Sequence, residues 1–269
     1  MKRALFLFSV SALAQSVGSP TLGYVIDADS RLLPILGVPG SARLGESLGA
    51  AAAADGSTVL RTNGEAYRGA QRIEGQWAFL ENGVLLDAAR RQGFARGRRY
   101  SFGSEVAKAA ASESRVLTLL ANENLVAWDA TGNAEFSVPA SIWWSIALSP
   151  AGEIFAFDAA AKSLLRFDAQ GRESVVAAFE DGIRIDALAV NATHAVMADL
   201  EHGKVYIVDI AAKSTRALKA PDNTDTVKPS ESGGVFLLSS DPSQPLWLLD
   251  PSLKNPLLVV PAKVEGGRQ

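Results

Sequence analysis

The hydrophobic residues in the second half of the chain fall into short runs that recur at a regular interval. Four apolar runs each end in an aspartate followed by a polar turn, and these aspartates are Asp129, Asp168, Asp209 and Asp250. They are separated by 39, 41 and 41 residues. A period near 40 residues indicates stacked units of supersecondary structure.

Each unit predicts four short strands. In the best-defined unit these strands, named a to d, lie at residues 145–149, 153–157, 163–167 and 173–178, with turn-forming residues between them. Strands b and c are apolar on both faces, whereas a sheet with one wet face would alternate. Strand a is rich in small residues and strand d carries charges. Four-stranded sheets that bury both faces and repeat around an axis form a β-propeller.

Residues 145–158, together with the Phe-Asp-x-x-Gly turn at 167–171, resemble the repeats of the NHL- and YVTN-type secreted β-propellers. The resemblance extends over residues 116–261. It implies a fold and little about function, because such propellers include binding proteins, lyases, lactonases and redox enzymes.

The N-terminal half carries a degenerate form of the repeat. Residues 23–36 suggest a c–d hairpin, residues 58–60 a strand b, and residues 77–87 a clear hairpin. Further c–d turns are expected near positions 27, 68 and 87. The sequence therefore predicts an all-β propeller of six or seven four-stranded blades, with seven favoured. One segment competes with this assignment, because residues 104–114 are rich in alanine and also fit a short helix.

The first 14 residues have the pattern of a secretory signal peptide. Lys2 and Arg3 precede an apolar run that closes on Ala12-Leu13-Ala14, a small-x-small cleavage pattern. The run is too short to span a bilayer, and no later segment is long enough. We expect residues 1–14 to be removed, residues 15–262 to form a single propeller, and residues 263–269 to be a frayed tail. We expect the protein to be located in the periplasm or the extracellular space. We also expect it to be a monomer without a transmembrane segment.

Composition excludes several kinds of chemistry. The 269 residues include no cysteine and only two histidines, and the formal net charge is −3. Thiol chemistry, disulfides, iron–sulfur clusters and Cys/His zinc sites are therefore excluded. Net acidity and export also argue against nucleic acid as a partner. We expect no cofactor and no metal, while a Ser/His/Asp triad stays open because its members need not be close in sequence.

Candidate binding residues are those that break the repeat at one rim of the ring. In this strand order the b–c and d–a connections share one face, where propellers form funnels. Aligned by the 41-residue shift, these connections carry different side chains in successive blades, as a binding site needs. The candidates are Trp143, Trp144, Arg184, Asp186, Asp225, Asp158, Asp199 and His202. Because adjacent strand residues point in opposite directions, one tryptophan is expected to pack and the other to face the funnel.

Two other features have structural interpretations. The repeating aspartates are expected to hydrogen-bond the backbone of their own turns. Five arginines at positions 90, 91, 96, 98 and 99 indicate a solvated outer face, and the alternative is a site for an anionic surface such as a glycan or lipid headgroup.

Two functions from different classes fit these observations. The first is an exported, non-catalytic binding or scaffolding module that recognises a protein, peptide or glycan through one face of the ring. The alternative is a funnel-site lyase or hydrolase of a small or sugar-like substrate that uses Asp/Glu and Arg. Whether the chain is an enzyme is left open by the sequence.

The signal-peptide interpretation predicts a mature chain that begins at Gln15. Removal of Lys2 and Arg3 with the segment would change the formal net charge from −3 to −5. N-terminal sequencing of the exported protein should return Gln15 as the first residue. Recovery of exported protein with an intact Met1 would contradict the prediction.

Overall fold

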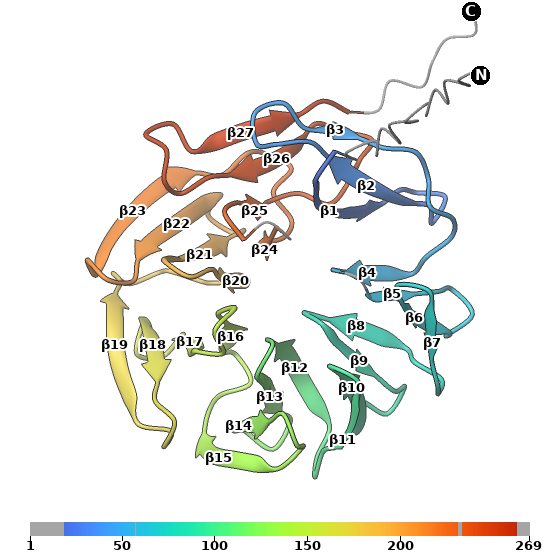
Figure 1. The fold of residues 1–269 in the computed structure, drawn as a ribbon. Coiled ribbons are helices and arrows are strands. Elements are labelled where there is room, and N and C mark those ends of the chain that lie inside the picture. Colours follow the sequence, from blue (N-terminus) through green and yellow to red (C-terminus); the bar gives the residue numbers. More distant parts are fainter. Residues whose placement is uncertain (1–18, 57, 231–232, 263–269) are drawn as a thin grey trace, which may run out of the picture.

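The computed structural model describes residues 19–56, 58–230 and 233–262. These residues form seven antiparallel sheets arranged as blades around a central axis, with no helix (Figure 1). The prediction of an all-β propeller is confirmed, and the number of blades is seven. Residues 1–14, predicted to be a signal peptide, and residues 263–269, predicted to be a frayed tail, lie outside the described residues.

The blades follow one another along the chain. Blade 1 contains β1 (Thr21–Ile26), β2 (Leu32–Leu36) and β3 (Arg43–Leu44). Blade 2 contains β4 (Ala53–Asp55), β5 (Thr58–Leu60), β6 (Ala66–Arg68) and β7 (Gln71–Ile73). Blade 3 contains β8 (Phe79–Glu81), β9 (Val84–Leu86), β10 (Gln92–Ala95) and β11 (Arg98–Ser101). Blade 4 contains β12 (Val106–Ala111), β13 (Arg115–Leu120), β14 (Asn124–Asp129) and β15 (Ala134–Pro139).

The last three blades are those in which the repeat is clearest. Blade 5 contains β16 (Ser145–Leu148), β17 (Ile154–Asp158), β18 (Ser163–Phe167) and β19 (Glu173–Ala178). Blade 6 contains β20 (Ala187–Val190), β21 (His194–Asp199), β22 (Lys204–Asp209) and β23 (Ser214–Lys219). Blade 7 contains β24 (Lys228–Pro229), β25 (Phe236–Leu237), β26 (Leu246–Leu249) and β27 (Leu257–Val260). In blades 2 to 7 the four strands pair in chain order, from a at the axis to d at the outside.

Blade 1 has three described strands, and their direction differs from the sequence prediction. The Ala51 amide donates to the Ser30 carbonyl at 2.8 Å, and Arg61, in the b–c turn of blade 2, donates to the Ala50 carbonyl. The β1–β2 turn therefore lies on the face that carries the b–c turns. Strands β1 to β3 thus occupy places b to d, and residues 23–36 form a b–c hairpin instead of the expected c–d hairpin.

Two further expectations for the N-terminal half are corrected. Residues 104–114 contain strand β12, the inner strand of blade 4, and not a helix. Strand pairing with β13 provides the hydrogen bonds that a helix would otherwise supply, so the helix propensity of alanine is overridden. The turn near Asp87 joins β9 to β10 and is a b–c turn, which explains its short spacing from the c–d turn after Arg68. Strand b at 58–60 and the hairpin at 77–87 are confirmed.

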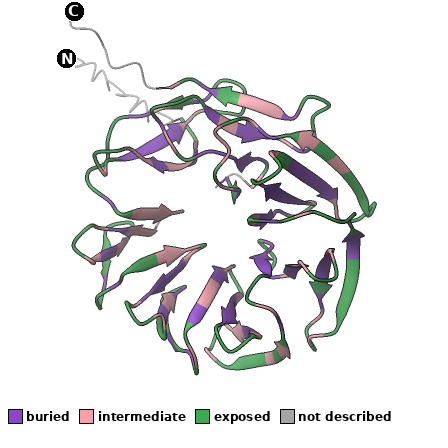
Figure 2. Cartoon of the chain, turned by 180° about the vertical axis from the view of Figure 1, so that it is seen from behind, coloured by how far each residue is buried: buried purple, intermediate pink, exposed green. Residues whose placement is uncertain are grey.

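The core consists of apolar layers between neighbouring blades. Strands β17 and β21 are almost entirely buried, while the outer strands β15 and β23 alternate exposed and partly buried residues (Figure 2). Phe155 and Phe157 point from one face of β17 into the layer shared with blade 6, whereas Ile154 and Ala156 point from the other face into the layer shared with blade 4, and all four are fully buried. Each fully buried side chain as large as phenylalanine or isoleucine contributes about 1.5–3 kcal/mol. A single isolated sheet would leave half of these side chains in water.

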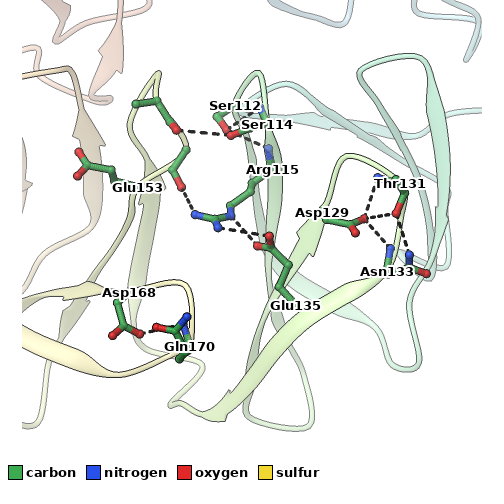
Figure 3. A network of polar contacts seen from close by, with 12 residues as sticks. Ser112, Ser114, Arg115, Asp129, Thr131, Asn133, Glu135, Glu153, Asp168 and Gln170 are labelled. Carbon is green, nitrogen blue, oxygen red and sulfur yellow. Dashed lines mark hydrogen bonds and ion pairs between the residues drawn. The ribbon is translucent and has the colours of Figure 1, made fainter.

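The repeating aspartates fix the c–d turns, as the sequence predicted. Asp129 Oδ1 accepts from the Thr131 and Asn133 amides at 2.7 and 2.9 Å, and Asp168 Oδ1 accepts from the Gln170 amide at 2.9 Å (Figure 3). Gly171 completes the blade 5 turn with φ of 76°, and a Cβ there would lie 2.9 Å from the ring of Phe136 in blade 4. The turn motif thus serves both its own hairpin and the contact with the preceding blade.

A guanidinium joins blade 4 to blade 5 near the same face. Arg115 Nε donates to Glu135 Oε2 at 2.5 Å, its Nη2 donates to the other oxygen of Glu135 at 3.3 Å, and its Nη1 donates to the Gly152 carbonyl at 3.1 Å (Figure 3). Both side chains of the ion pair are mostly buried, at 22% and 27% exposure. The contact therefore differs from an ordinary surface ion pair, which is solvated and weak.

We expect Arg115→Gln to lower the free energy of unfolding by about 1–2 kcal/mol, because Glu135 and the Gly152 carbonyl lose their donor. Urea unfolding followed by circular dichroism measures the change. Arg172→Gln is the matched control, since Arg172 pairs with Asp168 at 78% exposure and should cost less than about 0.5 kcal/mol. Equal effects of the two substitutions would contradict the interblade role of Arg115.

Candidate functional site

The candidate site lies on the face formed by the b–c turns and d–a loops, here called the upper face. The lower face carries the a–b and c–d turns. The two tryptophans of the d–a loop between β15 and β16 differ in burial. Trp144 is 6% exposed and packs against Phe167, with ring centroids 6.2 Å apart, whereas Trp143 is 72% exposed. Ile142 beside it is also exposed.

One position at the mouth of the ring carries a different side chain in successive blades. Lys108, Ser145 and Asp186 stand at the inner strands of blades 4, 5 and 6, or immediately before them. Lys108 Nζ donates to the Trp144 carbonyl at 2.7 Å, and Ser145 Oγ donates to the equivalent carbonyl of Ile185 at 2.9 Å. Asp186 instead accepts from the Leu200 amide at 3.0 Å. A cation, a hydroxyl and a carboxylate therefore occupy corresponding places.

The structure brings several of the predicted residues together in blade 6. Arg184 forms ion pairs of 3.3 Å with both Asp186 and Glu201. Asp199 is 1% exposed, and both of its carboxylate oxygens lie 2.9 Å from Nδ1 of His202. The His202 amide also donates to Asp199, at 3.0 Å. The buried carboxylate thus fixes the orientation of an imidazole whose side chain is 46% exposed.

A pocket of about 470 Å³ opens beside this histidine, between blades 5 and 6. We call it the blade 5/6 pocket. Phe179 and Tyr206 line it with their rings in edge contact at 5.5 Å, and Glu180, Asp181 and Lys204 add charges. Burial raises the pKa of Tyr206, and the charges of Asp199 and Glu180 raise it further. The pocket is therefore apolar in its walls and electronegative beside the tyrosine.

The remaining predicted residues make contacts of their own. Asp158 caps its b–c turn by accepting from the Ala160 amide at 2.8 Å. Asp225 accepts from the Ser240 hydroxyl at 2.6 Å in blade 7. Among the described residues, neither side chain forms a hydrogen bond or ion pair with the group in blade 6 that consists of Arg184, Asp186, Asp199, Glu201 and His202.

Sequence reasoning missed the charged residues of the central cavity. This cavity has a volume of about 420 Å³ and lies on the axis, where Asp55, Glu81, Lys108 and Lys228 line it together with the apolar ends of β1 and β16. Asp55 and Glu81 come from the three-residue inner strands of blades 2 and 3, in which the 41-residue repeat is not recognisable, whereas Lys108 lies on β12 of blade 4 and Lys228 on β24 of blade 7. The signal that could have found Lys108 is its position as the sole charge in an alanine-rich strand.

The cavity changes the protonation behaviour of two of these groups. Burial raises the pKa of Asp55 above its ordinary value of 3.8, although the charge of Lys228, the Gly83 amide and the charge of Arg96 act in the opposite direction. Burial also lowers the pKa of Lys108 below 10.5, opposed by the charges of Asp186 and Glu81. Both effects follow from the cost of a charge in a poorly solvated place.

Two kinds of feature, a metal-binding cluster and a membrane-spanning helix, are absent from the described residues. Within the described ranges, no group of three or more His, Cys, Asp or Glu side chains is arranged to hold a metal ion. The same part of the chain contains no helix with the length and apolar character needed to cross a membrane.

No protein-family model matches the chain, and no curated protein matches it in sequence. Solved structures do resemble it. Virginiamycin B lyase from Staphylococcus aureus aligns with a TM-score of 0.51 and 8% identity, over 91% of this chain and 86% of that one. A streptogramin B lyase gives 0.49 and 12% over 87% and 91%, and the computationally designed Ika8 protein gives 0.48 and 11% over 79% and 78%. At such identities the likeness concerns the β-propeller fold alone.

The raised pKa of Asp55 gives a pH-dependent prediction. The stability linked to this group is fully present below its ordinary pKa of 3.8 and is lost as the pH rises through the folded pKa. Asp55→Asn should therefore gain stability relative to the wild type between about pH 3 and pH 7. Parallel urea unfolding across that range measures the difference.

Asp129→Asn is the control of opposite sign. The Thr131 hydroxyl and the Asn133 amide hold the pKa of Asp129 below its ordinary value, so this variant should lose relative stability as the pH rises. If the difference in free energy of unfolding between wild type and Asp55→Asn does not change with pH, the prediction that folding disfavours the ionised form of Asp55 is wrong.

Proposed function

We propose that this propeller is a non-catalytic binding module that takes a cationic segment of a peptide or protein on its upper face. The observation that carries the proposal is the blade 5/6 pocket. It combines two aromatic walls, Phe179 and Tyr206, with the carboxylates of Glu180 and Asp181. A lysine or arginine side chain suits such a pocket, because its aliphatic stem packs on apolar walls while its charge meets carboxylates.

The surroundings of the pocket favour the same ligand. Carboxylates outnumber cations in the b–c turns and d–a loops of blades 5 to 7, where they are Asp158, Glu180, Asp181, Asp186, Asp199, Glu201, Asp222, Asp225 and Asp241. Three cations nearby are already paired, Lys162 with Asp181, Lys219 with Asp222, and Arg184 with two acids, and Lys204 is the cation that lines the pocket itself. Exposed Trp143 adds an aromatic side chain of the kind that is enriched at protein interfaces.

The place of action belongs to the same proposal. The basic start, apolar run and small-x-small pattern of residues 1–14 support export to the periplasm or beyond. The ligand would then be met outside the cytoplasm.

One observation favours the alternative of a funnel-site enzyme. Buried Asp199 holds Nδ1 of His202, which leaves Nε2 as the nitrogen available for proton transfer at the pocket mouth. An imidazole oriented by a carboxylate is the arrangement that general bases use. The described residues place no cysteine beside it and no metal cluster, so the support is limited to this pair.

Fluorescence anisotropy with two labelled octapeptides tests the proposal. One peptide alternates lysine with leucine, and the other replaces each lysine with glutamate. At low salt the lysine peptide should bind about tenfold more tightly or better, because the charges of the upper face attract one and repel the other. Glu180→Gln should weaken binding of the lysine peptide by about fivefold, since the pocket loses a carboxylate.

Glu173→Gln is the matched control, because Glu173 is an exposed acid on β19 of the same blade. It removes the same charge away from the pocket and should change the affinity less than about twofold. Equal binding of both peptides, or equal effects of the two variants, would overturn the proposal. Conversion of a bound substrate that His202→Gln abolishes at an unchanged melting temperature would replace it with the enzymatic alternative.

A further inference from the structure

Two adjoining hollows lie along the boundary between blades 2 and 3, towards the lower face. The inner one, of about 160 Å³, is lined by the a–b turn residues Asn82 and Gly83 and by Arg96 of the following c–d turn. The outer one, of about 330 Å³, is lined by strand β7 together with Arg99 of β11. Arg68 and Phe94 line both hollows, which therefore form one groove. We call it the blade 2/3 groove.

The groove has an excess of positive charge. The side chain of Arg68 has no hydrogen bond or ion pair within the described residues. Arg96 donates to the Ser112 carbonyl and Arg99 to the Glu74 carbonyl, both at 2.7 Å. These main-chain acceptors hold the two guanidiniums in place without neutralising them. Arg72 is the exception, because it pairs with Glu65 at 2.7 Å.

Two acids, Asp55 and Glu74, also line the groove. Asp55 lines the inner hollow, where the charges of Lys228 and Arg96 and the amide of Gly83 act on its carboxyl group. Glu74 lines the outer hollow, where Arg99 contacts its carbonyl. Among the described residues Arg68, Arg96 and Arg99 form no ion pair, so three unpaired guanidiniums face two acids in a protein whose formal net charge is −3. A local excess of positive charge is stronger evidence for an anion-binding site in an acidic protein than in a basic one.

The floor of the groove is rigid and apolar. Phe94 packs against Trp77 with ring centroids 6.0 Å apart, and the Arg99 guanidinium lies 5.8 Å from the Trp77 ring centroid. Trp77 itself is 5% exposed. Strands β5, β6 and β7 have only three residues each, so they provide little apolar surface to fill the boundary. Arginine side chains and open volume occupy the space that larger apolar side chains fill between blades 5 and 6.

We propose that the blade 2/3 groove binds a small organic molecule that carries two phosphate or sulfate groups. Arg96 would hold one group in the inner hollow and Arg99 the other in the outer hollow, with Arg68 between them. Guanidiniums suit this role because their forked donors match phosphate and sulfate oxygens in pairs. The face of Phe94, shared by both hollows, would contact the body that joins the two groups. The site is separate from the upper face and does not depend on its function.

Isothermal titration calorimetry at about 50 mM salt tests the proposal with three probes. These are fructose 1,6-bisphosphate, a disulfated disaccharide and inorganic phosphate. At least one of the two probes that carry two anionic groups should bind about tenfold more tightly than inorganic phosphate, because it engages both hollows at once. The tighter of the two then assigns the groove to phosphate esters or to sulfated sugars.

Arg68→Gln should weaken the preferred probe by about tenfold or more, and its melting temperature should match the wild type because Arg68 has no described partner to lose. Arg98→Gln is the matched control. Arg98 stands beside Arg99 on β11 and is exposed, yet it lines neither hollow. It should change the affinity less than about twofold. Equal losses from Arg68→Gln and Arg98→Gln, or no preference for a probe with two anionic groups over inorganic phosphate, would overturn the proposal.

Discussion

Apolar packing between neighbouring sheets is the interaction on which this molecule depends. Blades 3 to 7 each present buried side chains to both of their neighbours, so none of these five blades completes its own core. The layers between blades 4 and 5 and between blades 5 and 6 contain most of the large buried residues, including Phe155, Phe157 and Trp144. Hydrogen bonds such as those from Arg115 and Ser145 add direction to contacts that hydrophobic burial already favours.

The same packing explains which parts of the fold the sequence could predict. In blades 4 to 6 the strands have four to six residues, long enough for both faces to be apolar, and the turn aspartates mark the period from blade 4 to blade 7. In blades 2 and 3 most strands have three or four residues, so neither the apolar runs nor the period is visible. The sequence predicts a c–d hairpin at residues 23–36, where the structure has a b–c hairpin, because the two kinds of hairpin have similar sequences. Only contacts from Arg61 and Ala51 to the preceding segment distinguish the two.

The candidate site was predictable to the same extent. The loops of blades 5 to 7 could be aligned, and the structure does bring Arg184, Asp186, Asp199 and His202 together in blade 6. Asp55 and Lys228 were missed because an inner strand places side chains on the axis only when its direction and register are known. The two faces differ in charge as a result of these loops and turns. Acids dominate the upper face of blades 5 to 7, whereas arginines gather below the boundary of blades 2 and 3.

The bonds from Lys108 and Ser145 to main-chain carbonyls have a consequence for how the mouth of the ring can vary. Each side chain donates to the equivalent main-chain carbonyl that precedes the inner strand of the following blade, although one side chain is long and cationic and the other is short and neutral. Every residue type offers that carbonyl, so the acceptor persists whatever the loop sequence becomes. This main-chain acceptor therefore tolerates exchange of one donor side chain for another. The charge at the mouth of the ring can change in this way while the backbone stays the same.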